Sequence, residues 1–133
     1  MTEMQDPMEI YRASLEAIPL VEEKAPPAIE RAEVWPYPDL KRLWARVQVG
    51  QFASYPDLSF RVMDPQGETV CTLYMVDIRE PYQSITLHLR QAPQPDARYQ
   101  LEIELIRDDQ TLDTRTVDFD LTFRDPQAER PGG

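Results

Sequence analysis

Most residue types that build catalytic and metal sites are scarce in this chain of 133 residues. It has one histidine, His88, one cysteine, Cys71, and four glycines, two of which are the last two residues. A zinc centre built from Cys and His needs four such ligands, and a phosphate-binding loop needs several glycines. The counts exclude both kinds of site, and we expect no metal and no cofactor.

The chain also lacks a disulfide partner and a long apolar run. A single cysteine cannot form an internal bridge, which agrees with a reducing compartment, and we expect Cys71 to be a small core residue. The longest apolar run, residues 73–76, is far shorter than the ~20 residues that cross a bilayer. Glu3 and Asp6 stand where a secretory signal would carry Lys or Arg. We therefore expect a cytoplasmic protein that does not enter membranes.

Basic side chains are few. Lys and Arg number 14 against 24 Asp and Glu, which gives a net charge of −10 and a pI near 4.5. Phosphate backbones and anionic membranes select for clusters of Lys and Arg, so nucleic acid is excluded as a partner. Solubility explains such acidity, and a basic protein partner is the other explanation.

Arrangements that could support catalysis are weak. His88 and its candidate nucleophile Ser84 are four residues apart on one strand, roughly 13 Å, whereas such a pair must approach to about 3 Å. Alternate acids in two strands would be about 6.6 Å apart, within the range of glycosidase carboxylates; these are Glu102 with Glu104 and Asp118 with Asp120. Because they alternate with apolar residues, they are typical of the wet face of a sheet. We expect no enzyme.

From about residue 32 the apolar residues recur with a period of two, which is typical of half-buried strands. The pattern predicts seven strands, near residues 33–37, 43–49, 58–62, 69–78, 85–89, 99–105 and 117–123. Turn signals at residues 64–67 and 108–110 separate neighbouring strands. The sequence therefore predicts an all-β protein, a seven-stranded antiparallel sandwich over residues 29–124.

The stretch Pro95-Asp96-Ala97-Arg98-Tyr99-Gln100-Leu101 resembles the start of strand F in immunoglobulin-like and fibronectin type III-like domains. In those domains a tyrosine two residues before an inward-facing residue forms a tyrosine corner, and the resemblance assigns these roles to Tyr99 and Leu101. The chain lacks the inter-sheet cysteine pair, and Phe60 stands on the third strand in place of tryptophan. The resemblance implies an Ig-like fold and no function.

A short helix is predicted before the sandwich. Asp6-Pro7-Met8-Glu9 combines an N-cap, a proline suited to the first turn and an acid that can reach back to the cap. An apolar stripe follows at helical spacing and ends before Pro19; it consists of Met8, Tyr11, Leu15 and Ile18. Residues 1–28 thus read as an amphipathic helix with a proline-rich linker, and residues 125–133 as a disordered tail.

The strand near residues 69–78 is apolar on both faces, although a two-layer sandwich covers only one. Trp44, with Trp35 and Tyr37, is likewise out of phase with buried neighbours. We expect a non-catalytic interaction or structural module whose helix covers these surfaces, in the same chain or in a second copy; the helix as a free docking peptide is the other possibility. The candidate partner-binding residues are Met8, Tyr11, Leu15, Ile18, Trp35, Trp44, Tyr74 and Met75.

The alternative function is a small-ligand binder or enzyme with a site in the loops at one end of the sandwich. Loop residues that could build such a site are Tyr55, Asp57, Tyr82 and Asp96.

Overall fold

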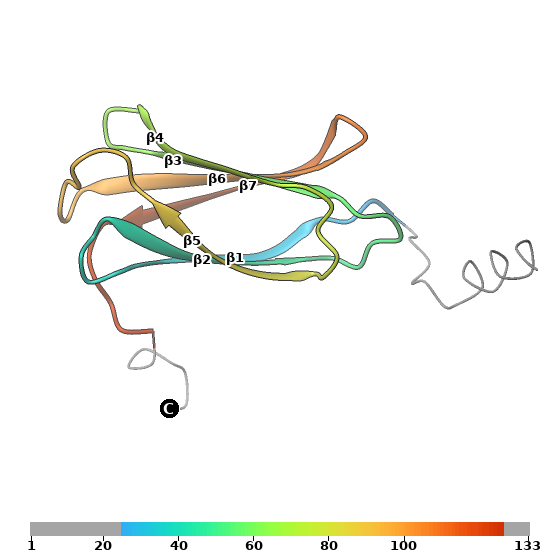
Figure 1. The fold of residues 1–133 in the computed structure, drawn as a ribbon, viewed down its shortest axis with the longest axis horizontal. Coiled ribbons are helices and arrows are strands. Elements are labelled where there is room, and N and C mark those ends of the chain that lie inside the picture. Colours follow the sequence, from blue (N-terminus) through green and yellow to red (C-terminus); the bar gives the residue numbers. More distant parts are fainter. Residues whose placement is uncertain (1–24, 127–133) are drawn as a thin grey trace, which may run out of the picture.

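The structure is a computed structural model, and it describes residues 25–126. Two antiparallel sheets face each other (Figure 1). One has the order β1-β2-β5, formed by β1 (Ile29–Pro36), β2 (Arg42–Val49) and β5 (Tyr82–His88). The other has the order β4-β3-β6-β7, formed by β4 (Thr69–Met75), β3 (Asp57–Met63), β6 (Arg98–Arg107) and β7 (Gln110–Asp120). The predicted all-β sandwich of seven strands is confirmed, whereas the predicted N-terminal helix and residues 127–133 of the predicted tail lie outside the described residues.

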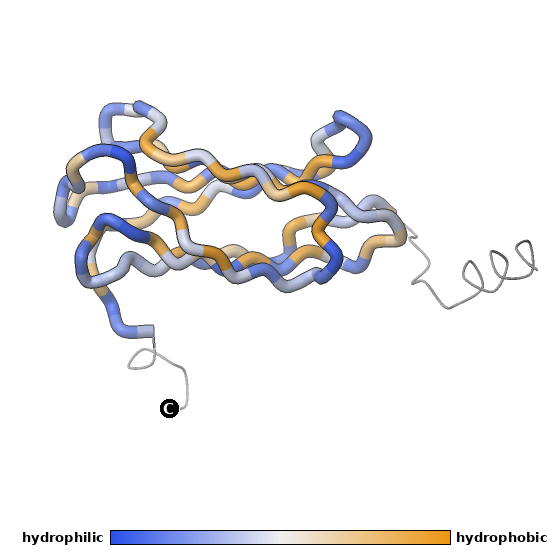
Figure 2. Tube along the Cα trace, in the orientation of Figure 1, coloured by the Kyte–Doolittle hydropathy of each residue, from blue (hydrophilic) through white to orange (hydrophobic). Residues whose placement is uncertain are grey.

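The core lies between the two sheets, where the alternating apolar residues of both meet (Figure 2). On β2 and β3 the inward side chains Leu43, Leu58 and Phe60 are at most 1% exposed. The inward residues of β6, Leu101, Ile103 and Leu105, are fully buried. The buried residues of the core cluster lie between Ile29 and Leu121, so this part of the chain supplies a core of its own.

Tyr99 shows the corner geometry that the sequence predicted. Its hydroxyl oxygen accepts a hydrogen bond from the backbone N–H of Gln94 at 3.0 Å, and the residue is 2% exposed. Its ring stacks on Phe119 with centroids 5.9 Å apart. The bond fixes the chain before β6 against the strand itself.

Both predicted turns are present. In the first, the buried carboxylate of Asp64 accepts the backbone N–H groups of Gln66 and Glu68, both at 2.9 Å, and Gly67 has a φ of 81°. In the second, Asp108 and Asp109 have φ values of 53° and 61°, the pair of positive angles of a type I′ hairpin turn. Aspartate tolerates this region better than most residues, and the β6–β7 hairpin closes directly on it.

A side-chain clasp joins the first strand to the opposite sheet. The carboxylate of Asp113 accepts the backbone N–H of Ile29 at 2.8 Å, and Arg115 donates to the carbonyl of Ile29 at 2.8 Å. Both side chains come from the core-facing side of β7, beyond the apolar residues. The clasp thereby pairs both backbone groups of Ile29 at the start of β1.

Two predicted strands end earlier than the alternation suggested. β4 stops at Met75, because Asp77 has a φ of 50° and interrupts the extended backbone. Ile78 is therefore buried, at 4% exposure, although the predicted alternation placed it with Val76, which is 68% exposed. β7 stops at Asp120, and Phe123, which was predicted to lie in the last strand, is 47% exposed.

Candidate interaction surfaces

The outer side of the β1-β2-β5 sheet carries two tryptophans that face each other across strands. Trp35 pairs directly with Trp44, and both are half-buried. The indole N–H of Trp44 donates to the Ser84 hydroxyl at 2.6 Å, and that of Trp35 donates to Glu33 at 3.4 Å. These are the only two tryptophans of the chain.

Arginines lie against the rings on the same side. The Arg46 guanidinium is 5.1 Å from the Trp44 ring centroid and 5.7 Å from that of Tyr82, and it donates to the Tyr82 hydroxyl at 3.1 Å. Such distances are within the range of cation–π attraction. One arginine thus bridges β2 and β5.

Two further arginines extend the arrangement. Arg42 lies 4.5 Å from the Tyr37 ring centroid and also pairs with Asp39 at 2.9 Å. Arg124, after β7, lies 4.9 Å from the ring centroid of Trp35. We name this surface the aromatic–arginine face; its residues are Trp35, Tyr37, Arg42, Trp44, Arg46, Tyr82 and Arg124.

The outer side of the β4-β3-β6-β7 sheet is different in kind. Its outward residues on β6 and β7 include Glu102, Glu104, Asp118 and Asp120, which we name the acidic face. Arg61 on β3 pairs with Glu102 at 3.0 Å, and Arg98 pairs with Asp120 at 3.1 Å. The predicted position of these acids on the outer face of the sheet is confirmed by the register.

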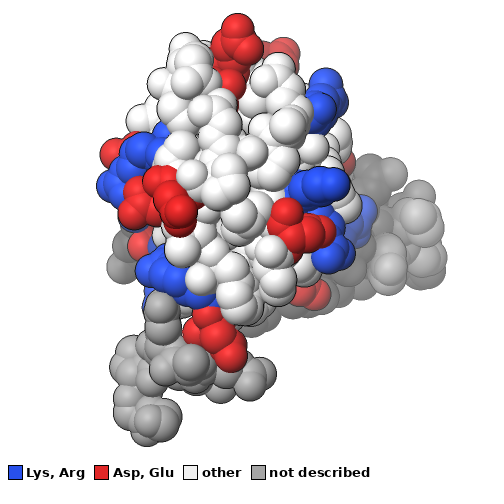
Figure 3. Space-filling view, turned by 90° about the vertical axis from the view of Figure 1, so that its left-hand side faces the viewer, with Lys and Arg blue, Asp and Glu red and all other residues white. Residues whose placement is uncertain are grey.

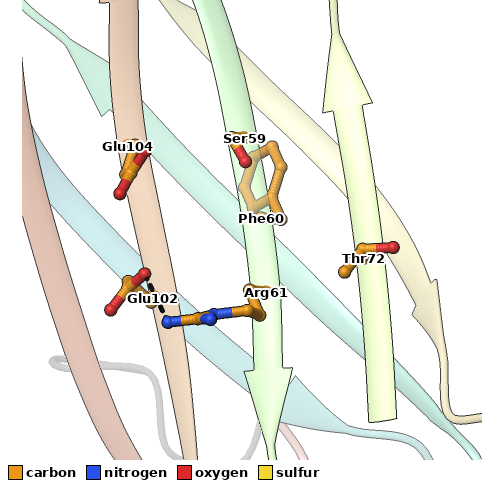
Figure 4. A pocket seen from close by; sticks show the side chains of 6 residues that line it. All are labelled: Ser59, Phe60, Arg61, Thr72, Glu102 and Glu104. Atoms are coloured by element: carbon orange, nitrogen blue, oxygen red, sulfur yellow. Dashed lines mark hydrogen bonds and ion pairs between the residues drawn. The ribbon is translucent and has the colours of Figure 1, made fainter. Parts of the chain in front are cut away.

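A shallow depression of about 250 Å³ lies on this face. Figure 4 shows Arg61 reaching from β3 to Glu102, with Glu104 beside it on β6 and Thr72 opposite on β4. Glu102 holds a guanidinium, so this carboxylate already has a partner. The floor of the depression is the sheet itself.

Charged side chains mark the flanks of the molecule. Seen from the end that holds the β1–β2 and β3–β4 turns, acidic and basic side chains gather on either side of an uncharged band (Figure 3). Sequence periodicity predicted which residues face outward. The difference between the aromatic–arginine face and the acidic face arises from cross-strand neighbours, which only the register reveals.

The predicted partner-binding residues lie on separate surfaces. Trp35 and Trp44 are together on the aromatic–arginine face, as described. Tyr74 lies on the outer side of the other sheet, at the β4 edge, and its hydroxyl donates to Asp57 at 2.8 Å. Met75 turns inward and packs against the core. One helix cannot cover Trp44 and Tyr74 together, because the two sheets lie between them; Met8, Tyr11, Leu15 and Ile18 lie outside the described residues.

The loop residues of the alternative site do not share one end. Tyr55, Asp57 and Tyr82 lie at or beside the β2–β3 and β4–β5 connections, whereas Asp96 lies before β6 at the opposite end of the sandwich. There Asp96 accepts from the Thr122 hydroxyl at 2.8 Å. The four residues therefore cannot all line one site at a single end of the sandwich.

The remaining candidates for chemistry are Ser84, His88 and Cys71. Ser84 accepts the Trp44 indole N–H, while His88 lies opposite Arg42 on the same outer face of β5. Cys71 is 6% exposed, and burial raises the pKa of its thiol.

Within residues 25–126, no three His, Cys, Asp or Glu side chains form a group that could hold a metal ion. No helix in this part of the chain is long and apolar enough to span a membrane.

Sequence reasoning singled out the tryptophans but missed the arginines that accompany them. The signal was present in β2, where Arg42, Trp44 and Arg46 alternate with buried residues. Tyr82 was assigned to a loop. Arg124 carried no signal, because nothing in the sequence indicates that the segment after β7 lies beside β1.

No protein-family model and no curated protein matches this sequence. Similar solved structures include an FMN-binding β-glucuronidase from Facaelibacterium prausnitzii L2-6, 12% identical over 71% of this chain and 16% of that chain, with a TM-score of 0.55. A glycosyl hydrolase family 2 member from Bacteroides cellulosilyticus DSM 14838 is 18% identical over 72% of this chain and 15% of that chain, with a TM-score of 0.54. A β-glucuronidase from Parabacteroides merdae is 16% identical over 71% of this chain and 13% of that chain, with a TM-score of 0.55.

This likeness shows the fold alone. The chain spans about one-sixth of the first of these structures and less of the other two. What the similarity establishes is a β-sandwich of a kind that also occurs inside larger enzymes.

Proposed function

We propose that this protein is a non-catalytic interaction module whose contact surface is the aromatic–arginine face. The ligand we propose is an acidic, amphipathic protein segment. The observation that carries the proposal is the gathering of four aromatic rings and three arginines on one sheet face of a chain whose net charge is −10.

The residue types support protein binding. Trp, Tyr and Arg are the residues most enriched at the energetic centres of protein interfaces. An arginine stacked on a ring keeps the N–H donors at the edge of its plane, so it can still hold a carboxylate. Arg46 thus offers charge to a ligand whose apolar side chains would lie on Trp35 and Trp44, while Arg42 is already paired with Asp39.

The chain itself contains a segment of the required chemistry. Residues 1–24 include six acids and two bases, along with the apolar Met8, Tyr11, Leu15 and Ile18. This segment enters the sandwich at β1, an edge strand of the sheet that carries the aromatic–arginine face. A peptide of this segment is therefore the first ligand to test on the aromatic–arginine face.

The finer fold assignment also belongs to the proposal. We infer an immunoglobulin-like or fibronectin type III-like domain, because the 1-2-5 and 4-3-6-7 strand orders accompany the Tyr99 corner. Such sandwiches commonly serve as binding and spacer domains, but the fold does not determine the function.

Intrinsic fluorescence provides the test, because both tryptophans lie on the proposed surface. A synthetic peptide of residues 1–24 is titrated into residues 25–133, which contain the whole described core. We expect a saturable change in tryptophan emission that weakens as salt is raised from 0.05 to 0.5 M, since salt screens charge contacts. Arg46→Ala should weaken binding about tenfold, a loss of about 1.4 kcal/mol.

Arg61→Ala is the matched control, because it removes an exposed, partnered arginine from the opposite face. It should leave the affinity unchanged. Equal affinities for Arg46→Ala and the parent, or no emission change at millimolar peptide, would exclude the aromatic–arginine face as the site for such a segment.

An accessory domain beside a catalytic one is the second candidate function. It is favoured by the solved structures that this chain resembles, which contain the sandwich as a minor part of a glycosyl hydrolase. A screen of the full chain for glycoside hydrolysis tests the alternative enzyme function: an accessory domain by itself should give no turnover, and turnover that survives Arg46→Ala would favour a site elsewhere.

A further inference from the structure

β4 is an edge strand whose second half, from Thr72 onward, has none of the residues that usually protect an edge. It pairs only with β3, at the margin of the four-stranded sheet. Residues 69–76, Thr-Val-Cys-Thr-Leu-Tyr-Met-Val, include no charge, no proline and no glycine. Native proteins normally place lysine, proline or inward charges on such edges to prevent pairing with other strands.

The other three edge strands do have such features. β1 contains Glu30, Arg31 and Glu33, and the clasp from β7 holds its start. β7 carries four charged residues, and β5 begins directly after Pro81 and ends at His88. Within the described sandwich, β4 and β5 are therefore the two edge strands without Asp, Glu, Lys or Arg, and β4 is the one that also has neither a histidine nor a proline directly before it.

Apolar side chains are exposed on both sides of this edge. Leu73 faces the core side but lies beyond the cover of the smaller sheet, and it is 36% exposed. Tyr74 faces outward at 53% exposure, and Val76, just after the strand, is 68% exposed. A strand added beside β4 would cover all three.

The first half of β4 is already occupied. A bulge between Val62 and Met63 in the pairing of β3 with β4 adds Val70 as an extra residue, and the carbonyl of Val70 accepts the backbone N–H of Arg90 at 2.9 Å. An added strand must therefore pair with the second half, residues 72–76.

We propose that β4 pairs with β4 of a second copy of this chain, antiparallel about a two-fold axis. An antiparallel strand pair with itself brings identical residues together in reverse order, which is costly where they are charged and favourable where they are not. Directly opposite residues must share a sheet face, so the two-fold axis passes midway between the two copies of one residue. Because the first half of β4 is occupied, that residue is Leu73 or Tyr74. The two four-stranded sheets then form one continuous sheet.

The expected dimer is weak and strengthens with salt. One pair of short strands buries less than the ~1,200 Å² typical of small specific interfaces, so association should depend on concentration. Each copy carries a net charge of −10, and salt screens the repulsion between them. Salt should thus strengthen this dimer, whereas it should weaken the binding of an acidic ligand to the aromatic–arginine face.

Sedimentation of the full chain over a range of concentrations tests the proposal. We expect the average mass to rise from 15.5 kDa toward twice that value, and to rise further in 0.5 M salt. Leu73→Lys and Tyr74→Lys should each hold the mass at one chain, because the axis would bring two lysines close together. Amide exchange in residues 72–75 should slow as concentration rises.

Thr116→Lys is the matched control, since it adds the same charge at an exposed position of β7. It should leave dimerisation unchanged or slightly favour it by lowering the net charge. A mass that stays at one chain, an equal mass increase in both edge variants, or full amide protection of residues 72–75 in the monomer would overturn the proposal; the last result would mean that the chain covers its own edge.

Trp44→Ala separates this inference from the proposed function. The substitution lies on the opposite side of the molecule and should not alter the concentration dependence of the mass. If it abolishes the dimer, the copies meet through the aromatic–arginine face and the β4 proposal fails while the proposed surface gains support.

Discussion

The two outer faces of this sandwich follow one backbone rule and differ in chemistry. On both, outward side chains alternate with buried ones. On the aromatic–arginine face Arg42, Arg46 and Arg124 lie over rings and Arg42 also pairs with Asp39, whereas on the acidic face Arg61 and Arg98 pair with carboxylates. The comparison shows that periodicity determines which side chains face outward, while cross-strand neighbours determine what the face can bind.

The two kinds of contact also differ in energy. Exposed ion pairs contribute about 0–1 kcal/mol and are weakened by salt. A guanidinium over a ring contributes about 0.5–1 kcal/mol even when exposed, and it covers apolar surface as well. The aromatic–arginine face should therefore stabilise the fold more than the acidic face does.

Removing Trp44 should have the largest effect. Trp44→Ala deletes a half-buried ring, its contact with the Arg46 guanidinium and the hydrogen bond to Ser84. We expect a loss of about 2 kcal/mol in the free energy of unfolding, below the 3–5 kcal/mol of a fully buried tryptophan. Urea denaturation measures it. A loss below about 0.5 kcal/mol would mean that the face contributes nothing to stability.

Replacing one arginine on each face should have the next largest effects on the free energy of unfolding. Arg46→Ala removes contacts with two rings and a hydroxyl, and should cost about 1–2 kcal/mol. Arg61→Ala removes one exposed ion pair and should cost at most about 0.5 kcal/mol, less in 0.5 M salt. Parallel urea titrations at two salt concentrations compare them, and equal costs would abolish the distinction between the faces.

Replacing a glutamate by alanine should change stability by a small amount whose sign differs between the two faces. Glu33→Ala loses the contacts with Arg31 and Trp35, and should lower stability by up to about 0.5 kcal/mol. Glu104→Ala removes the like charge beside Glu102 on the same face of β6 and should raise stability by a similar small amount. Thermal melts at low salt resolve the difference, and a shared sign would count against it.

The smallest effect concerns the one tyrosine beside the acidic face. The hydrogen bond from Tyr74 to Asp57, together with desolvation and the charges of Asp57 and Asp109, raises the pKa of Tyr74 above its ordinary value of 10.0. The folded chain thus holds this proton to higher pH than the unfolded chain, so the associated stability is complete below pH 10.0 and is lost as pH rises through the folded pKa. Ultraviolet titration should show a late step that Tyr74→Phe removes and Tyr82→Phe leaves in place.

Much of the fold was predictable from the sequence, because period two and turn chemistry are local properties. The seven strands and the turn at Asp64 follow from such signals, whereas the role of Tyr99 was implied by the resemblance to strand F of immunoglobulin-like domains. The end of β4 was not predictable, since the positive φ of Asp77 depends on the Asp57 carboxylate that accepts its N–H at 2.9 Å. That contact links residues twenty positions apart.

The candidate surfaces were predictable only in part. Trp44 was identified because it is out of phase with its buried neighbours. Its separation from Tyr74 was not apparent, because strand order decides which sheet each strand joins, and strand order is a property of the whole chain. Arg124 lies beside Trp35 through a contact between distant segments, for which the sequence has no local pattern.

The clasp on Ile29 has a mechanical consequence. A strand at the edge of a sheet, pulled from its free end, ordinarily peels away one hydrogen bond at a time. Here Asp113 and Arg115 hold the first residue of β1 against the far sheet, so tension arriving through the N-terminal segment must first break both bonds. Load is then shared by the two layers, and the domain should resist extension at this junction better than its three-stranded sheet could by itself.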